Sequence, residues 1–440
     1  MGIWDSFPEG IAALVQDGIL DGAFQQGLYP ETVFKNLGQE IPTPGGIGTK
    51  QILTKPGLMP VSTTPNNTSD ATVNNYGFEQ YSVTIDNYSS SIPTNLTMSA
   101  MAFANKFVQD QAQIGRNAAL TLNALATTAL YEPYGSGATY ATETTTTATS
   151  VTVEDGYSFA QAYTIAAGGS GNAIGLNAAP SLVLAAVSAT NPLAVTIGGV
   201  ANTVTNCVFS AGTSGPATLT LGTAASVANG AAVVSSQGAL GFYANGRASV
   251  NQIVAGDLPT LSLIQSARAR LVAQGVPMIR GAYTVLCPPE TMTGLYQDPA
   301  FQSAARGAVE SPVYKDLALG RFLGCDWVEN NLVPMVSNQG GVEVYRPIML
   351  GQGALIRSPF TEMGSLLAGL AFQGVADVQM IGGVARIIQA PLDRQASVVN
   401  TTWRWIGDYT CGTDALMERG QPNTSTTSAL YKRAVVLSHA

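Results

Sequence analysis

The residue best suited to catalysis in this sequence is its single histidine, His439, next to the C-terminal residue. A histidine works as a general base only when a third group holds its ring, and a chain end provides this only if it is buried. Zinc sites need several histidines or closely spaced cysteines. The four cysteines form no CxxC pair and stand far apart: Cys207, Cys287, Cys325 and Cys411. This spacing predicts reduced thiols rather than a metal site or a disulfide framework.

Glycine-rich segments are the next candidates, because such loops can cradle phosphate groups. Residues 45–50 read GGIGTK, but the GxxxxGK spacing is absent and no buried strand precedes them. Gly169 and Gly171 lack the third glycine of a dinucleotide fingerprint. Neither Ser170 nor Ser214 lies in a GxSxG motif. We predict that these glycines are turn residues.

Charged residues suggest no reaction either. The nearest acid pairs are Glu154 with Asp155 and Asp326 with Glu329. Acid–base catalysis needs two carboxyl groups in different environments across a cleft, and adjacent acids are usually solvated. The basic residues do not cluster, and we expect those near 268–280 and 432–433 to pair with neighbouring acids. The sequence therefore predicts no catalytic, cofactor-binding or metal-binding residue and no enzyme.

The composition of the 440 residues is unusual in its low charge. Charged residues make up 11% of the chain, against about 25% in typical domains, while 46% of residues are hydrophobic. This predicts a surface of neutral polar residues or one covered by partners. The net charge of −8 makes direct DNA binding unfavourable. Neither a signal peptide nor a membrane helix is expected.

The first 134 residues predict three elements. Residues 1–45, rich in glycine and proline, look like an arm that lies along another surface. Residues 46–92 look like a long hairpin, whose return strand alternates apolar and polar residues around Tyr81 and Val83. Residues 93–134 contain a long helix that should end before Pro133. Its apolar positions recur at spacings of four and seven: Phe103, Phe107, Ile114, Ala118, Leu125 and Ala129.

Residues 135–250 differ in kind, because no Asp, Glu, Lys or Arg occurs from Gly156 to Gly246. Short runs rich in β-branched residues, separated by turn residues, predict an inserted β-domain, either a barrel or a sandwich. A disordered linker is the less favoured alternative, because disordered segments are usually charged. The predicted strands are 195–197, 203–209, 217–221 and 231–234.

Residues 251–440 predict an α/β region. A helix is expected between Pro259 and Gly275, and a second helix from Pro288 onwards. The predicted strands are 282–287, 322–328, 384–388, 398–406 and 434–437.

Three stretches of this half resemble the major capsid proteins of tailed bacteriophages. They are residues 290–301 (ETMTGLYQDPAF), residues 320–331 (GRFLGCDWVENN) and residues 390–395 (APLDRQ). The order of elements also resembles that family. The resemblance covers roughly 300 residues. It implies an α+β chain of the Hong Kong 97 capsid type: an N-terminal arm, an extended loop, a spine helix, and peripheral and axial domains. Residues 135–250 are then an all-β insertion.

The resemblance implies a shell-forming function. Copies would assemble as hexamers and pentamers into an icosahedral virion shell in the host cytoplasm, enclosing double-stranded DNA without reading its sequence. The expected partners are a portal, a separate scaffolding protein and, in some relatives, a decoration protein; no cofactor or membrane is expected. The alternative is an exported, β-rich, adhesin-like surface protein, suggested by the Thr/Ala/Gly-rich middle. An enzyme ranks third.

Overall fold

The structure is a computed structural model that describes residues 18–31, 34, 37–46, 48–57, 65, 67, 76–95, 106–166, 181–306, 321–372, 376–389, 398–416 and 429–440. The chain divides into two compact units, which are described separately. Unit 1 comprises Met1–Ile52, Ser82–Ala126 and Leu355–Thr410. Unit 2 comprises Leu53–Tyr81, Thr127–Ala354 and Cys411–Ala440.

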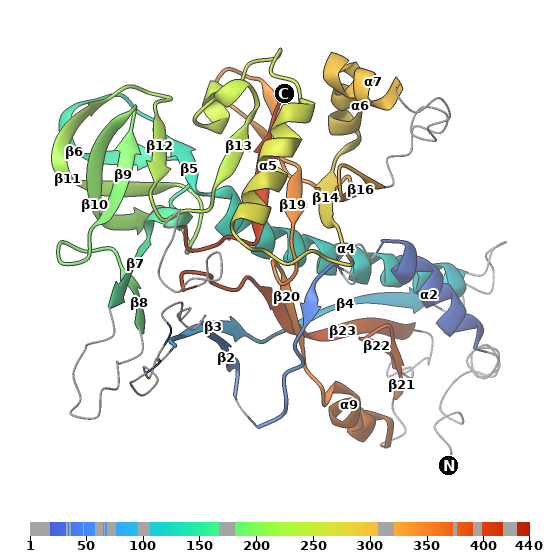
Figure 1. The fold of residues 1–440 in the computed structure, drawn as a ribbon. Helices are drawn as coiled ribbons and strands as arrows, with labels where there is room; N and C mark the ends of the chain where they lie inside the picture. Colours follow the sequence, from blue (N-terminus) through green and yellow to red (C-terminus); the bar gives the residue numbers. More distant parts are fainter. Residues whose placement is uncertain are drawn as a thin grey trace. The chain divides into compact units, whose positions relative to one another are not determined.

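Unit 1 is built on a six-stranded sheet whose central strand is β23 (Val398–Thr410). Burial alternates along β23 residue by residue, so that Trp403 and Trp405 point into the core. One helix of this unit, α9 (Met363–Phe372), packs on β21 (Figure 1). The other strands are β1 (Gln39–Glu40), β4 (Asp86–Asn95), β20 (Ile356–Pro359), β21 (Ala376–Ile381) and β22 (Val384–Gln389).

Two helices of unit 1 pack closely because glycines allow their backbones to meet. They are α2 (Ile19–Glu31) and the first part of α4 (Lys106–Gly135), which lie side by side in Figure 1. A Cβ atom on Gly27 would lie 2.1 Å from the Ala112 carbonyl oxygen, and one on Gly115 would lie 2.4 Å from that of Phe24. Because β1 also pairs with β20, the described part of the predicted arm packs on its own unit, contrary to expectation.

The apolar spacing correctly predicts α4, but its predicted end is wrong. The helix continues through Pro133 to Gly135. Proline has no N–H and cannot donate to the carbonyl four residues earlier, here that of Ala129. This oxygen instead accepts a hydrogen bond from the Cys411 thiol, with S and O 3.3 Å apart. The predicted residues before Lys106 lie outside the described part.

Unit 2 contains a six-stranded mixed sheet in the order β13-β24-β19-β14-β16-β15. Helices α5 and α6 share one core with it, which includes Leu271, Val285 and Leu295. The strands are β13 (Gly241–Tyr243), β14 (Tyr283–Cys287), β15 (Arg321–Phe322), β16 (Cys325–Glu329), β19 (Ile348–Leu350) and β24 (Ala434–Ser438). The helices are α5 (Leu261–Ala273), α6 (Pro289–Gln297) and α7 (Pro299–Arg306). β17 (Met335–Ser337) and β18 (Glu343–Tyr345) pair antiparallel and form a separate two-stranded ribbon.

The single strand predicted at 322–328 is in fact a tight hairpin. β15 and β16 pair antiparallel, with Phe322 opposite Cys325. The two residues between them, Leu323 and Gly324, both have positive φ, at 55° and 71°. Two successive left-handed residues make the turn that fits the twist of a hairpin. Leucine rarely adopts this conformation, so the sequence carries a weak signal for the turn.

The uncharged middle of the chain folds as predicted, and the structure decides between barrel and sandwich. Six strands form one sheet in the order β5-β12-β9-β10-β11-β6 (Figure 1). Its two edges meet where Ala141 bridges Val153 and the N–H of Thr142 donates to the Thr152 carbonyl oxygen at 2.9 Å. The sheet is therefore closed into a barrel around an apolar core. The strands are β5 (Ala138–Tyr140), β6 (Thr145–Val153), β9 (Leu193–Ile197), β10 (Val200–Phe209), β11 (Ala217–Val227) and β12 (Ala232–Ser235).

Unit 2 also contains a short two-stranded ribbon and three 3-10 turns. A short ribbon, β7 (Gln161–Ala166) with β8 (Ser181–Ala186), extends from the barrel. The three 3-10 turns are η3 (Tyr157–Phe159), before β7, and η4 (Ala244–Gly246) and η5 (Val250–Gln252), after the barrel. The α+β class expected from the sequence is confirmed by these elements.

Candidate functional site

The hairpin of β2 (Lys50–Pro56) and β3 (Phe78–Thr84) forms a two-stranded sheet of its own, as β7–β8 and β17–β18 also do. Burial alternates along both strands, which gives the ribbon an inner and an outer face. On the outer face, Ile52 is 62% exposed and Phe78 is 53% exposed. The rings of Tyr76 and Phe78 lie 5.3 Å apart. An isolated two-stranded ribbon is marginal in water, so this apolar outer face is a candidate contact surface.

The predicted limit of this hairpin at residue 92 is too late. β4 begins at Asp86 and pairs along its whole length with β23. Residues 86–92 therefore belong to the sheet of unit 1. The polar stretch from Pro56 to Asn75, predicted to form the tip of this hairpin, is described only at residues 56, 57, 65 and 67.

An ionic cluster within unit 2 holds the end of the hairpin where β2 stops and β3 begins. Asp414 accepts hydrogen bonds from Lys55 and from Nε of Arg433, the latter at 2.9 Å to Oδ1. Lys55 also donates to the Thr413 carbonyl oxygen at 3.1 Å. Arg433 reaches the Gln352 carbonyl oxygen at 2.8 Å. One nearly buried carboxylate is thus paired with two cations, and the expected pairing of Arg433 with an acid is found.

Glu79 completes this cluster, and the sequence analysis missed it. Its side chain is buried, with 1% of the residue exposed, and accepts hydrogen bonds from the backbone N–H groups of Ala415 and Leu416. The alternation that places Tyr81 and Val83 on the inner face also places Glu79 there. A carboxylate at an inward position was therefore the available signal. Burial raises the pKa of Tyr81 in the same cluster.

His439 is held, but not in a catalytic arrangement. The C-terminal strand β24 lies inside its sheet, and the ring of His439 is buried. Its Nε2 lies 2.7 Å from the Thr291 hydroxyl and its Nδ1 lies 3.0 Å from the Ala440 carbonyl oxygen. Burial lowers its pKa, so the imidazole is neutral at pH 7. Both ring nitrogens are engaged and solvent is excluded, which is the geometry of a structural histidine.

The remaining sequence candidates are placed as follows. A Cβ on Gly45 would meet the Glu362 carboxylate at 2.4 Å, so an acid faces the GGIGTK segment where a phosphate would need positive charge. Asp326 is paired with Arg321 at 2.8 Å rather than with Glu329. Gly169, Ser170 and Gly171 lie outside the described residues. Within the described part of the chain, no group of three or more His, Cys, Asp or Glu residues could hold a metal ion.

All four cysteines are free thiols, as predicted, and three of them are buried. Burial raises the pKa of the Cys207 and Cys325 thiols to about 11 and that of Cys287 to about 12. A thiol is a nucleophile only as a thiolate. These cysteines therefore pack as small apolar groups.

One buried acid in unit 1 gives the fold a pH dependence. Burial raises the pKa of Asp408 to about 6, although the N–H of Tyr409 donates to its Oδ1 at 2.8 Å; the Asp86 carboxylate raises it further. A carboxyl group whose folded pKa exceeds its unfolded value of about 3.9 costs stability once it is charged. Stability is therefore lost as pH rises from about 4 to about 6 and stays lower above that range.

The Asp408→Asn variant is expected to be more stable than the wild type at pH 7.5, by about 1–2 kcal/mol after allowance for partial exposure. Asparagine keeps the acceptor for Tyr409 and removes the charge. No gain is expected at pH 4, where the aspartate is protonated. Thermal melts at both pH values measure this, with Asp326→Asn as the control that should not stabilise. An equal shift at both pH values would contradict the assignment.

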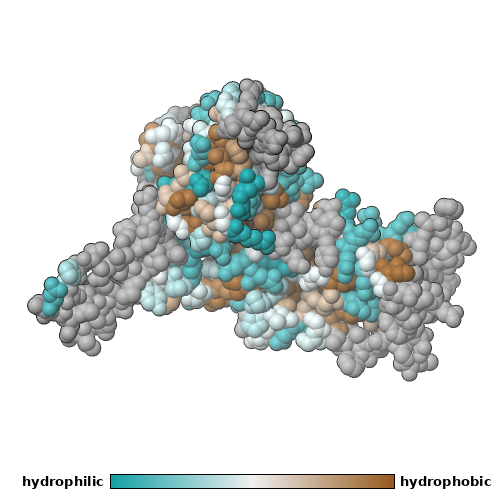
Figure 2. Space-filling model, turned by 45° about the vertical axis from the view of Figure 1, so that its right-hand side comes forward, coloured by the Kyte–Doolittle hydropathy of each residue, from teal (hydrophilic) through white to brown (hydrophobic). Residues whose placement is uncertain are grey.

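Exposed apolar residues are not confined to the hairpin. Figure 2 shows brown apolar patches in several places on one face, separated by hydrophilic residues. The most exposed examples outside the hairpin are Val200, Val208, Leu366 and Met335. No helix among the described residues is both long and apolar enough to cross a membrane.

Comparisons with known proteins give structural likeness without sequence likeness. No family model matches the chain, and no curated protein matches its sequence. The capsid of Ralstonia phage GP4 is similar at 13% identity and a TM-score of 0.49, over 93% of this chain and 90% of that one. The cyanophage Pam1 capsid is similar at 9% identity and a TM-score of 0.47, over 94% and 91%. The capsid of Helicobacter pylori bacteriophage KHP30 is similar at 8% identity and a TM-score of 0.44, over 93% and 90%. All three are phage capsids. Because each TM-score is below 0.5, the function proposed below rests on this chain's own geometry.

Proposed function

We propose that this chain is the major capsid protein of a tailed bacteriophage and forms an icosahedral shell around double-stranded DNA. In this proposal the hairpin β2–β3 is the extended loop and α4 is the spine helix. The sheet of unit 1 belongs to the peripheral domain, the sheet of unit 2 to the axial domain, and the barrel is an insertion. The element order is that of the Hong Kong 97-type chain expected from the sequence.

The hairpin is the observation that carries this proposal. The end of the hairpin where β2 stops and β3 begins is fixed by Asp414 and Glu79, whereas the outer face of its strands exposes Ile52 and Phe78. A hairpin that is held in place and has an uncovered apolar face suits an element that lies on a second copy of the chain. Each contact of this kind is modest, but closed symmetry repeats it in every subunit.

The low charge of the chain fits the same function. Neutral surfaces are easily covered by neighbouring copies, because few charges must be desolvated. The net charge of −8 favours a protein that encloses DNA without binding its phosphates tightly. A portal and a separate scaffolding protein remain expected partners, with hexamers and pentamers as the building units and the virion as the location.

Electron microscopy of the purified recombinant chain tests the proposal. Shells, or hexameric and pentameric rings, are the expected result, because the contact surfaces are part of the chain itself. Size-exclusion chromatography of the same sample should show species much larger than a monomer. Monomers at high concentration would overturn the proposal, and fibres would favour the exported surface protein instead.

The barrel provides a second test, because the chain enters and leaves it at adjacent points. A Cβ on Gly238 would lie 2.6 Å from the Gly137 Cα, so these two glycines are in contact. Removal of residues 138–237 and direct joining of the two glycines should leave the sheet of unit 2 folded. We expect shells that fail to form or burst on mild heating, since the barrel is proposed to bridge neighbouring copies. Normal, heat-stable shells would exclude an essential bridge.

A further inference from the structure

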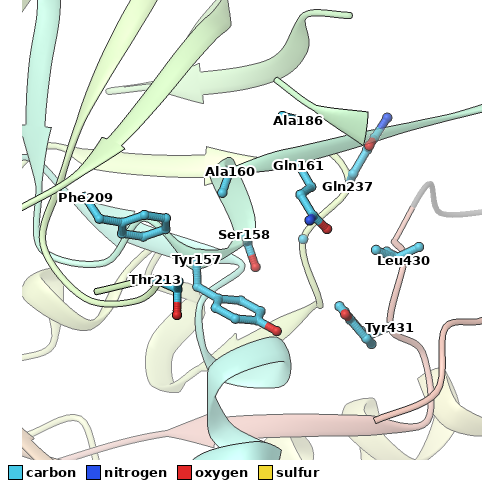
Figure 3. Close-up of a pocket in the computed structure, with 11 residues that line it drawn as sticks. Tyr157, Ser158, Ala160, Gln161, Ala186, Phe209, Thr213, Gln237, Leu430 and Tyr431 are labelled. Atoms are coloured by element: carbon cyan, nitrogen blue, oxygen red, sulfur yellow. The ribbon is translucent and has the colours of Figure 1, made fainter. Parts of the chain in front are cut away.

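The geometry points to a binding site for a neutral sugar ring in unit 2, where the barrel meets the segment Leu430–Tyr431. A cavity of about 320 Å³ opens there (Figure 3). Its lining includes three aromatic rings and several hydroxyl and amide groups, from Tyr157, Ser158, Gln161, Phe209, Thr213 and Tyr431. Pockets for small ligands are of this size and combine apolar walls with a few polar groups.

The two tyrosine walls are fixed before any ligand arrives. Tyr157 lies on η3, where its backbone N–H donates to the Asp155 carboxylate at 3.0 Å and where Phe159 is fully buried. The Tyr431 ring packs edge-on against Tyr134, with centroids 5.8 Å apart. Rigid walls lose little entropy on binding, which favours affinity.

The back of the cavity is fixed as well. The side-chain amide of Gln237 accepts from the N–H of Tyr163 at 2.8 Å and donates to its carbonyl oxygen at 3.0 Å. The backbone carbonyl of Gln237 accepts from the N–H of Leu430 at 2.9 Å. Gln237 therefore links the barrel to the C-terminal segment and is not free to bind a ligand.

Two other polar groups do remain available. The side-chain amide of Gln161 points into the cavity in Figure 3 and has no hydrogen-bond partner among the described residues. The Ser158 hydroxyl lies 2.6 Å from the Ser136 hydroxyl, and Ser136 donates to the Glu132 carbonyl oxygen. Ser158 must then donate to Ser136, which leaves its own oxygen as an acceptor. The cavity thus offers both a donor and acceptors.

The absence of charge selects the ligand class. Among the described residues that line the cavity, none has a charged side chain, so a charged ligand would lose its hydration without gaining a counter-ion from them. Aromatic faces carry negative potential and attract the C–H groups on the apolar face of a sugar ring. Gln161 and Ser158 match hydroxyl groups at the ring's edge. A hexopyranose combines an apolar face with such an edge.

Saturation-transfer NMR on the full-length chain tests this inference. The probes are the methyl glycosides of glucose, galactose and mannose, together with N-acetylglucosamine; glucuronate and glucosamine serve as charged counterparts. We expect signal from at least one neutral sugar and none from the charged pair. The Gln161→Ala variant should weaken binding about tenfold, as expected for loss of a ligand hydrogen bond. Thr164→Ala is the control, because Thr164 is exposed on the same strand outside the cavity.

Failure of every neutral sugar to bind, or unchanged binding in Gln161→Ala, would overturn the inference. Binding of a neutral Ala/Gly/Ser peptide in place of sugars, lost in the same variant, would overturn it in favour of a peptide groove. Neither outcome bears on shell formation, because binding is measured on the chain whether or not it assembles.

Discussion

The Ile52→Asp/Phe78→Asp double variant is expected to fold and to form no shells. Both side chains are more than half exposed on the outer face of the hairpin, so the fold loses little when they change. In the proposed shell the same face is covered by a second copy. A carboxylate placed there without a partner costs several kcal/mol, and two of them would weaken each contact by more than about 1,000-fold.

Negative-stain microscopy and analytical ultracentrifugation measure assembly, and circular dichroism reports the fold. The matched control is Ile52→Val/Phe78→Leu, which keeps both positions apolar and should still form shells. Intact shells in the aspartate variant would show that this face is not a subunit contact. Loss of shells in both variants would mean that assembly depends on the size and shape of the Ile52 and Phe78 side chains, and not only on their being apolar.

The sequence predicts best those elements whose signal is local. The spacing that defines α4 needs only one helix face, and the short strands of the barrel alternate with clear turn residues. The order of the barrel strands and the closure at Ala141–Val153 depend on pairs that are distant in sequence, which no local pattern records. The choice between barrel and sandwich therefore stayed open until the structure was known.

The errors arise where tertiary contacts override a local rule. A proline usually ends a helix, but here the Cys411 thiol donates a hydrogen bond to the Ala129 carbonyl oxygen that Pro133 leaves unpaired. Glycines near α2 suggest weak helix propensity, yet Gly27 is what allows the close contact with α4. Leu323 adopts a left-handed conformation that leucine rarely takes. The ionic cluster at the hairpin could not be predicted from the sequence either, because Glu79 and Asp414 are distant in the chain and no motif contains both.

The second large effect concerns Arg386, a fully buried arginine in the core of unit 1. Its NH2 donates to Asp377 at 3.0 Å, and its NH1 lies 2.6 Å from Asp21 of α2. Burial lowers the pKa of Arg386 and raises that of Asp377, which shows how costly both charges are here. Removal of one partner of a buried ion pair typically costs about 3–5 kcal/mol.

The Arg386→Met variant is therefore expected to destabilise β21 and β22 locally by about 3 kcal/mol. Hydrogen exchange of residues 376–389 should become roughly 100-fold faster at pH 7.5. The effect should shrink as the pH is lowered, because burial raises the pKa of the Asp377 carboxyl and proton uptake removes its unpaired charge.

Two further variants separate loss of charge pairing from loss of packing. Arg404→Met removes an arginine from the same sheet whose Nε only reaches the exposed Asn87 side chain at 2.8 Å, so little change is expected. Arg386→Met/Asp377→Leu removes both charges and should recover most of the lost protection, since an apolar pair can replace a buried ion pair. Exchange as fast in this double variant as in Arg386→Met would mean that the packing of the arginine side chain, rather than the unpaired aspartate, determines stability.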